Sequence, residues 1–117
     1  MIYFEPSDFS LFNAIKFSKE LILGESAYNL RVGICEGHMD EKTYSIQKVE
    51  LKDFFGNAVN ASSRMESKVA GVGGTIAFTS LTGISDELVK SVGAQKVENI
   101  PDLKGVTVKS AYKIKVK

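Results

Sequence analysis

A thiol, an imidazole and three carboxylates lie within seven residues of one another in the first half of the chain. They belong to Cys35, Glu36, His38, Asp40 and Glu41. Such groups are ligands for transition metals, and a thiol next to an imidazole is also a cysteine nucleophile with its base. A structural zinc site usually needs four nitrogen or sulfur ligands, however, and the chain has one Cys and one His. We therefore expect a buried thiol followed by a solvated loop, with no metal, no cofactor and no catalytic residue.

A cluster of glycines, Gly71, Gly73 and Gly74, is the second feature whose residue types could do chemistry. Phosphate-binding loops are rich in glycine because their backbone N–H groups must approach the phosphate. This cluster lacks the Lys-Ser/Thr pair of a P-loop, and residues 75–81 after it have the composition of a strand, where a phosphate site needs a helix. The glycines thus predict a bent strand or a flexible hairpin.

The composition is that of a single globular domain, which we assign to residues 1–117. Hydrophobic residues make up 44% and charged residues 25% of the chain. The net charge of +1 excludes a polycation. The halves differ, because residues 1–58 have six Lys and Arg against nine Asp and Glu, and residues 59–117 have nine against five. An anionic partner is therefore expected to meet the second half.

The number of cysteines and the length of the apolar runs indicate the cellular compartment in which the protein is expected. A lone cysteine cannot form an internal disulfide, which fits a reducing compartment. No basic segment followed by an apolar one opens the sequence, and no apolar run approaches the roughly 20 residues of a membrane span. We expect a cytoplasmic protein, of cellular or viral origin.

The C-terminal end has the clearest strand pattern. Val106, Val108, Tyr112, Ile114 and Val116 share one parity, and lysines dominate the other. This period of two predicts a long half-buried strand with a lysine face. Such a strand needs neighbouring strands and a hydrophobic layer beneath it, so the chain is expected to build a sheet or barrel.

The elements before it are predicted by the same patterns. Residues 28–34, 43–55, 75–81 and 95–100 are expected to be strands, and 57–67 a mobile loop or one poor helical turn. Ser85 as N-cap, Asp86 and Glu87 in the first turn and Gly93 after the last turn predict a short helix. The pattern of residues 9–23 fits both a helix and an extended strand. We expect a helix in their first part and a strand in their second, and the pattern does not decide between the two interpretations.

The resulting order is strand, strand, strand, helix, strand, strand, with glycines in long bent strands. This order resembles the five-stranded oligonucleotide-binding (OB) barrel of small phage and bacterial single-stranded-DNA-binding proteins, over about residues 27–117. The resemblance implies a mainly β (α+β) fold with the short helix between the third and fourth strands. The N-terminal segment has no counterpart in it, and the lysine-rich end departs from the acidic tail of that family.

The resemblance also implies a non-catalytic protein that binds single-stranded DNA without strong sequence preference, in replication or recombination. A cationic groove with aromatic stacking platforms would do this. The residues expected to form it are Tyr44, Lys48, Lys52, Phe54, Phe55, Arg64, Lys68, Phe78, Lys109 and Lys113. The three Phe residues also fit a hydrophobic core, and the lysines a solubilised edge. The alternative is a non-catalytic interaction module that oligomerises by strand pairing, and a homo-oligomer is expected in either case.

Overall fold

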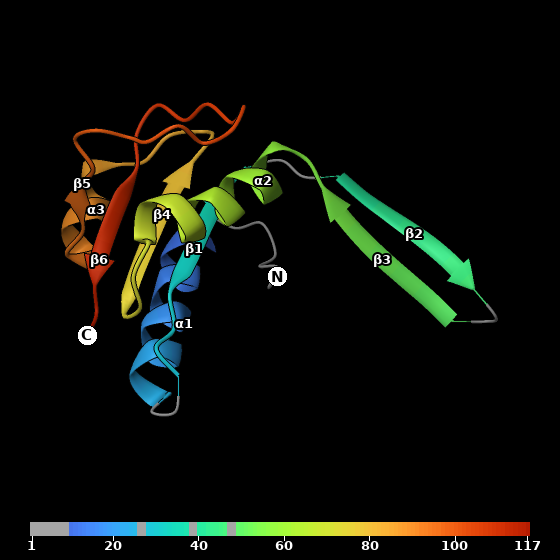
Figure 1. Cartoon of the computed structure of the whole chain (residues 1–117), viewed down its shortest axis with the longest axis horizontal. Helices are drawn as coiled ribbons and strands as arrows, with labels where there is room; N and C mark the ends of the chain where they lie inside the picture. The colour runs from blue at the N-terminus through green and yellow to red at the C-terminus, as the bar shows by residue number, and fades with distance from the viewer. Residues whose placement is uncertain (1–9, 26–27, 38–39, 47–48) are drawn as a thin grey trace.

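A mixed sheet of four strands organises the chain. The computed structural model describes residues 10–25, 28–37, 40–46 and 49–117. In chain order the elements are α1 (Ser10–Gly24), β1 (Val32–Glu36), β2 (Asp40–Ile46), β3 (Val49–Phe55), α2 (Asn57–Arg64), η1 (Met65–Ala70), β4 (Thr75–Ser80), α3 (Asp86–Val92), β5 (Gln95–Lys96) and β6 (Tyr112–Lys115). The sheet has the order β1-β4-β6-β5, while β2 and β3 form a separate antiparallel pair. Figure 1 shows this pair extending away from the rest of the molecule as a ribbon.

Strand β4 is the centre of the sheet. It pairs in parallel with β1, where Ile76 lies opposite Val32, and antiparallel with β6, where Ile76 lies opposite Ile114. All six residues of β4 are buried. In such a sheet a helical layer covers each face, so the central strand is buried on both faces. A strand of this kind has a nearly continuous apolar sequence.

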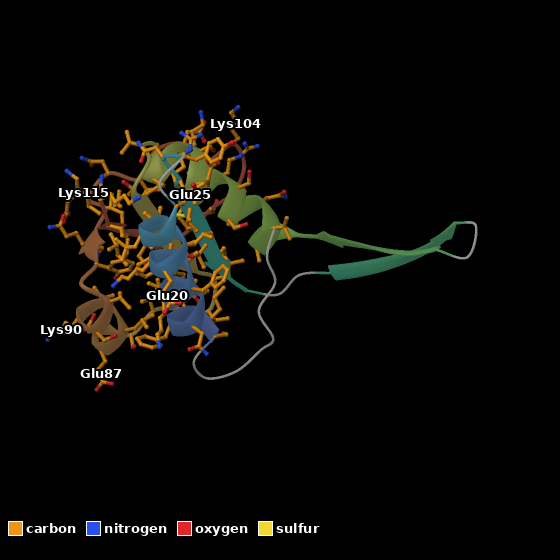
Figure 2. The ribbon with its side chains drawn as sticks, turned by 90° about the horizontal axis from the view of Figure 1, so that it is seen from below. Glu20, Glu25, Glu87, Lys90, Lys104 and Lys115 are labelled. Atoms are coloured by element: carbon orange, nitrogen blue, oxygen red, sulfur yellow. The ribbon has the colours of Figure 1, made fainter. Side chains whose placement is uncertain are left out.

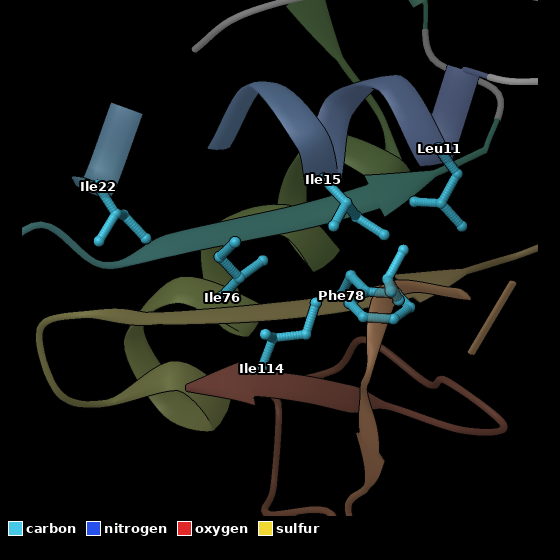
Figure 3. Packing of buried hydrophobic residues seen from close by; sticks show 7 residues of the cluster. Leu11, Ile15, Ile22, Ile76, Phe78 and Ile114 are labelled. Atoms are coloured by element: carbon cyan, nitrogen blue, oxygen red, sulfur yellow. The ribbon is translucent and has the colours of Figure 1, made fainter. Parts of the chain in front are cut away.

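Helix α1 covers one face of the sheet (Figure 3). Its buried residues recur at helical spacing and include Leu11, Ile15 and Ile22. They pack with Ile76 and Phe78 of β4, and with Ile114 of β6 and Val92 of α3. This stripe explains why residues 10–24 form one helix, and it makes the strand prediction for the second part of this segment wrong.

Helix α2 and its continuation η1, a π-helix, cover the other face. Met65, Val69 and Ala70 form a second core with Ala77 of β4 and with a cluster from the C-terminal region. That cluster consists of Leu103 and Ala111, with Val106 and Val108 partly buried beside them. The molecule is therefore a helix–sheet–helix sandwich.

Helix α3 begins and ends as the sequence predicts. The Ser85 hydroxyl accepts a hydrogen bond from the Leu88 N–H at 3.2 Å, and Gly93 has the left-handed conformation, with φ 69° and ψ 35°. The Lys19 ammonium of α1 donates to the Val92 carbonyl at 2.9 Å, which ties the end of α3 to α1. Among the described residues, no helix has the length and apolar character needed to cross a membrane.

The prediction of a closed five-stranded barrel is wrong. The four-stranded sheet is open, with β1 and β5 at its two edges. Strand β1 pairs in parallel with β4, and the chain crosses between them through α2 and η1, whereas small OB barrels are built from bent strands that close on themselves. The buried helical layer on each face leaves no barrel interior.

Four of the predicted strands differ from the structure. The strand expected at 28–34 is β1, which runs from Val32 to Glu36. The segment expected as one strand at 43–55 contributes instead to two paired strands, β2 and β3, in which Tyr44 lies opposite Leu51. The C-terminal strand is confined to Tyr112–Lys115, because Val106 and Val108 before it pack on the second core outside any strand. The expected strand at 95–100 is the two-residue β5. Residues 57–67, expected to be a mobile loop or one poor helical turn, belong to α2 and η1, because Ala58, Ala61 and Met65 form a buried stripe.

Candidate functional site

Polar side chains form a row on helix α2 beside its buried stripe. Asn57, Asn60 and Arg64 are spaced by three and four residues, so they follow one another along one side of the helix. Asn57 and Asn60 are exposed, and Arg64 is half-buried. The row therefore offers two amides and a guanidinium to a ligand that approaches this side of α2.

Arg64 has a hydrogen-bonding deficit. Its Nε is buried and, among the described residues, is the one buried side-chain nitrogen or oxygen that has no hydrogen-bond partner. Leaving a buried donor unpaired typically costs about 1–3 kcal/mol, and more when the group is charged. A guanidinium also presents a planar fork of donors that fits phosphate or carboxylate oxygens. The structure thus contains a half-buried cationic side chain with an unpaired donor, of the kind that pairs with anionic ligands.

The backbone of β1 holds α2 and η1 in position. A Cβ atom added at Gly33 would lie 2.2 Å from the Ser62 carbonyl oxygen and 2.2 Å from the Glu66 nitrogen, so the strand and the helical segment touch through their backbones. Arg31, just before β1, forms an ion pair with Glu66 and donates to the Gly71 carbonyl at 2.8 Å. These contacts fix the helical segment that carries Asn60 and Arg64.

The thiol of Cys35, on β1, is unsuited to nucleophilic chemistry. Burial, with a smaller contribution from the negative charge of Glu36, raises the pKa of Cys35 to about 11. The thiolate is the reactive form, and little of it exists at neutral pH. Within the part of the chain that the structure describes, no three His, Cys, Asp or Glu residues lie close enough to hold a metal ion. His38 lies outside the described residues.

Glu36, the neighbour of Cys35, has a structural role. Its carboxylate accepts hydrogen bonds from Ser10 at 3.0 Å, from Ser80 at 2.9 Å and from Thr82 at 3.4 Å. These hydroxyls come from the start of α1, the end of β4 and the residues after it. The carboxylate therefore joins α1 to the ends of the two parallel strands.

The ten residues expected to form one groove are dispersed. Tyr44 lies on β2, and Lys52, Phe54 and Phe55 lie on β3, whose side chains are not described, while Lys48 falls outside the described residues. Arg64 ends α2 and Lys68 is exposed on η1.

The remaining three lie in the sheet or beside it. Phe78 is fully buried in β4 and stacks on Tyr112 with ring centroids 5.6 Å apart, so the expectation that it stacks on bases is wrong. Lys109 precedes β6, and Lys113 is exposed on that strand.

Asn57 and Asn60 were missed by the sequence reasoning because their segment was interpreted as a loop. A usable signal was present: Ala58, Ala61, Met65 and Val69 are spaced as one apolar stripe. Small alanines made this stripe weak, since a methyl group contributes little to an apolar pattern.

A family model described as the adenylate and guanylate cyclase catalytic domain matches residues 8–115. The match runs from just before α1 to the end of β6, and so includes both helical layers, the sheet and the ribbon. No curated protein and no solved structure matches the chain significantly.

This match overturns the functional expectations drawn from the resemblance to single-stranded-DNA-binding proteins. The open sheet, with a helical layer on each face, is consistent with a cyclase-like α+β fold. The predictions of a DNA-binding function in replication or recombination, of a viral DNA-binding protein, of a single-stranded nucleic acid partner and of a non-enzyme are therefore wrong. The alternative of a non-catalytic interaction module is wrong for the same reason, while the homo-oligomer stays a prediction. The matched residues span most of the chain, and the chain belongs to the adenylate and guanylate cyclase catalytic domain family.

Proposed function

We propose that the chain binds a nucleoside triphosphate along helix α2 and takes part in converting it to a cyclic nucleotide. The observation that carries the proposal is the buried, unpaired Nε of Arg64, on a helix that lies wholly within the family match. A triphosphate supplies the anionic oxygens that this donor lacks.

The cyclisation reaction explains what such a donor would do. The 3′-oxygen of the nucleotide attacks its own α-phosphorus, the bond from that phosphorus to the bridging oxygen of the β-phosphate breaks, and pyrophosphate leaves. The proton of the 3′-hydroxyl passes to a base or to water. Negative charge develops on the phosphate oxygens as the bonds change, so a positioned cationic donor stabilises the transition state. Arg64 would contact these oxygens, and the Asn60 amide, one helical turn away, would orient the nucleotide.

Helix packing would make this donor effective. A group contributes most to catalysis when it is held in place before the substrate binds. The close approach of Gly33 to the helix backbone and the contacts of Arg31 provide such rigidity. A cytoplasmic location, where nucleoside triphosphates are abundant, would fit both this substrate and the lone Cys35.

The test is titration of the chain with ATP and GTP by isothermal calorimetry, together with an assay for cyclic nucleotide. Arg64→Gln removes the charge at similar length and should weaken triphosphate binding by about 10- to 100-fold, as expected for a hydrogen bond to a charged group. Asn60→Ala should weaken binding less, by about 2- to 10-fold.

Lys68→Gln is the matched control, because it removes one positive charge from the same helical segment at an exposed position. It should change binding less than 2-fold. Thermal melts of each variant separate loss of binding from loss of folding. If Arg64→Gln and Lys68→Gln weaken binding equally, or if neither triphosphate binds the folded chain, the proposal is wrong.

A further inference from the structure

We propose that a cleft on the sheet face covered by η1 binds a small organic phosphate. The cleft lies between the end of η1 and strands β5 and β6, and has a volume of about 430 Å³. That volume is in the range of small-molecule sites in proteins, roughly 300–1,000 Å³. Neither Asn60 nor Arg64 lines it, so the inference stands independently of the proposed triphosphate site.

The polar side chains of the cleft come from three neighbouring strands. Lys113 and Lys115 are two residues apart on β6, so both side chains project to the same face of the sheet. Their Cα atoms are about 7 Å apart. Gln95 of β5 lies directly opposite Lys113, and Thr75 of β4 lies directly opposite Lys115. The strand pairing therefore brings two ammonium groups, an amide and a hydroxyl to one place.

The charges of this cleft are uncompensated. No Asp or Glu lines it, and the ion pair found among the described side chains joins Arg31 and Glu66, which lie outside it. A phosphate monoester carries between one and two negative charges at neutral pH and offers three acceptor oxygens. Such a group would neutralise both lysines and accept hydrogen bonds from each.

One wall of the cleft is apolar. Val72 lines it and is 68% exposed. Gly73 lines the cleft beside it. A ligand with an organic part next to its phosphate would cover Val72 while the phosphate meets the lysines. Figure 2 shows Lys115 at the side of the body away from the β2–β3 ribbon, and both Lys113 and Lys115 are exposed.

The test is NMR titration of the ¹⁵N-labelled full chain with glucose 6-phosphate, inorganic phosphate and glucose. Glucose 6-phosphate should shift the amide signals of Gly73, Gln95 and Lys113, and should bind more tightly than inorganic phosphate. Glucose alone should shift none of them. Lack of binding by glucose 6-phosphate at millimolar concentration would overturn the proposal, as would equal binding of the ester and inorganic phosphate or binding of glucose through the same signals.

Charge-matched variants distinguish a specific site in the cleft from nonspecific attraction of the phosphate to the positive charge of the protein. Lys113→Gln with Lys115→Gln should weaken glucose 6-phosphate binding at least 10-fold. Lys16→Gln with Lys90→Gln removes the same charge from exposed positions on α1 and α3 and should change it less than 2-fold. Equal weakening of glucose 6-phosphate binding in the two double variants would show that the proposal is wrong. Arg64→Gln should leave this binding unchanged, so that failure of the triphosphate proposal and failure of this one give different results.

Discussion

Gly33 is the residue through which β1 touches the helical layer that carries Arg64. A methyl group there would meet two backbone atoms of the helix at 2.2 Å, and backbone cannot move aside as a flexible side chain can. Overpacking of this kind typically costs about 1–3 kcal/mol, and occasionally more. The position therefore needs glycine for space rather than for an unusual backbone conformation.

We expect Gly33→Ala to lower the free energy of unfolding by about 3 kcal/mol, the upper end for overpacking. Gly24→Ala is the control, because an added Cβ there meets nothing within 4 Å. Urea denaturation followed by circular dichroism measures both. A Gly33→Ala variant as stable as Gly24→Ala would show that the strand and helix do not approach this closely.

Cys35 provides a second test at the level of a single residue. Because burial raises its pKa to about 11, its thiolate fraction near pH 7.5 should be on the order of 100-fold below that of an ordinary cysteine. Iodoacetamide should therefore alkylate the native chain on the order of 100-fold more slowly than the chain unfolded in urea, as followed by mass spectrometry. Equal rates in the two states would contradict the raised pKa.

The same shift gives the direction of one pH effect. The folded state keeps the Cys35 proton to higher pH than the unfolded state does, so this contribution to stability is complete below the unfolded pKa and is lost as pH rises toward about 11. The Cys35→Ala variant should lack this loss. The comparison is a pair of urea titrations at pH 8 and pH 10.

At the scale of elements, α3 has the best-defined ends. The Ser85 hydroxyl accepts the Leu88 N–H, and Gly93 closes the helix in a left-handed conformation. Capping side chains of this kind typically contribute about 0.5–2 kcal/mol. The capped helix also forms part of the core, because its residue Val92 packs in the cluster formed with α1.

Ser85→Ala should lower the free energy of unfolding by about 1 kcal/mol, and Ser85→Asp should retain most of it, since a carboxylate also caps and favours a helix N-terminus. Ser91→Ala serves as the control, because its hydroxyl donates to the Leu88 carbonyl within the helix and caps nothing. Chemical denaturation measures all three. If Ser91→Ala costs as much as Ser85→Ala, capping is not the cause.

Elements with strong local signals were predictable from the sequence, and α3 is the clearest case. Helix α2 was not, because its apolar stripe is built largely from alanines. The β2–β3 pair was predicted as one strand because residues 43–55 form a single run of mixed polar and apolar residues. The row of Asn57, Asn60 and Arg64 was hidden for the same reason as α2: it becomes a row only once the segment is helical.

At the scale of the whole molecule, the order of the strands depends on contacts far apart in the sequence. The pairing of Val32 with Ile76 is parallel and joins positions separated by the ribbon and by α2 and η1. Local patterns carry no information on such a pairing, so the same list of strands fitted a barrel as well as an open sheet. The two buried layers decide between them, and they become visible only when α1 and α2 are both recognised as helices.

The β2–β3 ribbon extends away from this sandwich (Figures 1 and 2). Its strands pair with each other from Asp40 opposite Phe55 to Ile46 opposite Val49, and with no strand of the four-stranded sheet. The stability of the body should therefore depend little on the outer part of the ribbon.

Shortening the ribbon tests this independence. Replacing residues 43–52 by Asn-Gly leaves Lys42 opposite Asp53, a spacing that a two-residue hairpin turn can close without moving the base of the ribbon. The melting temperature of the body should fall by no more than about 4 °C, the shift that about 1 kcal/mol causes in a domain of this size. Leu11→Ala, which truncates a core residue of α1, is the contrasting control and should cost about 2–5 kcal/mol. A ribbon deletion as damaging as Leu11→Ala would mean that the ribbon packs on the body and that the sandwich is not stable by itself.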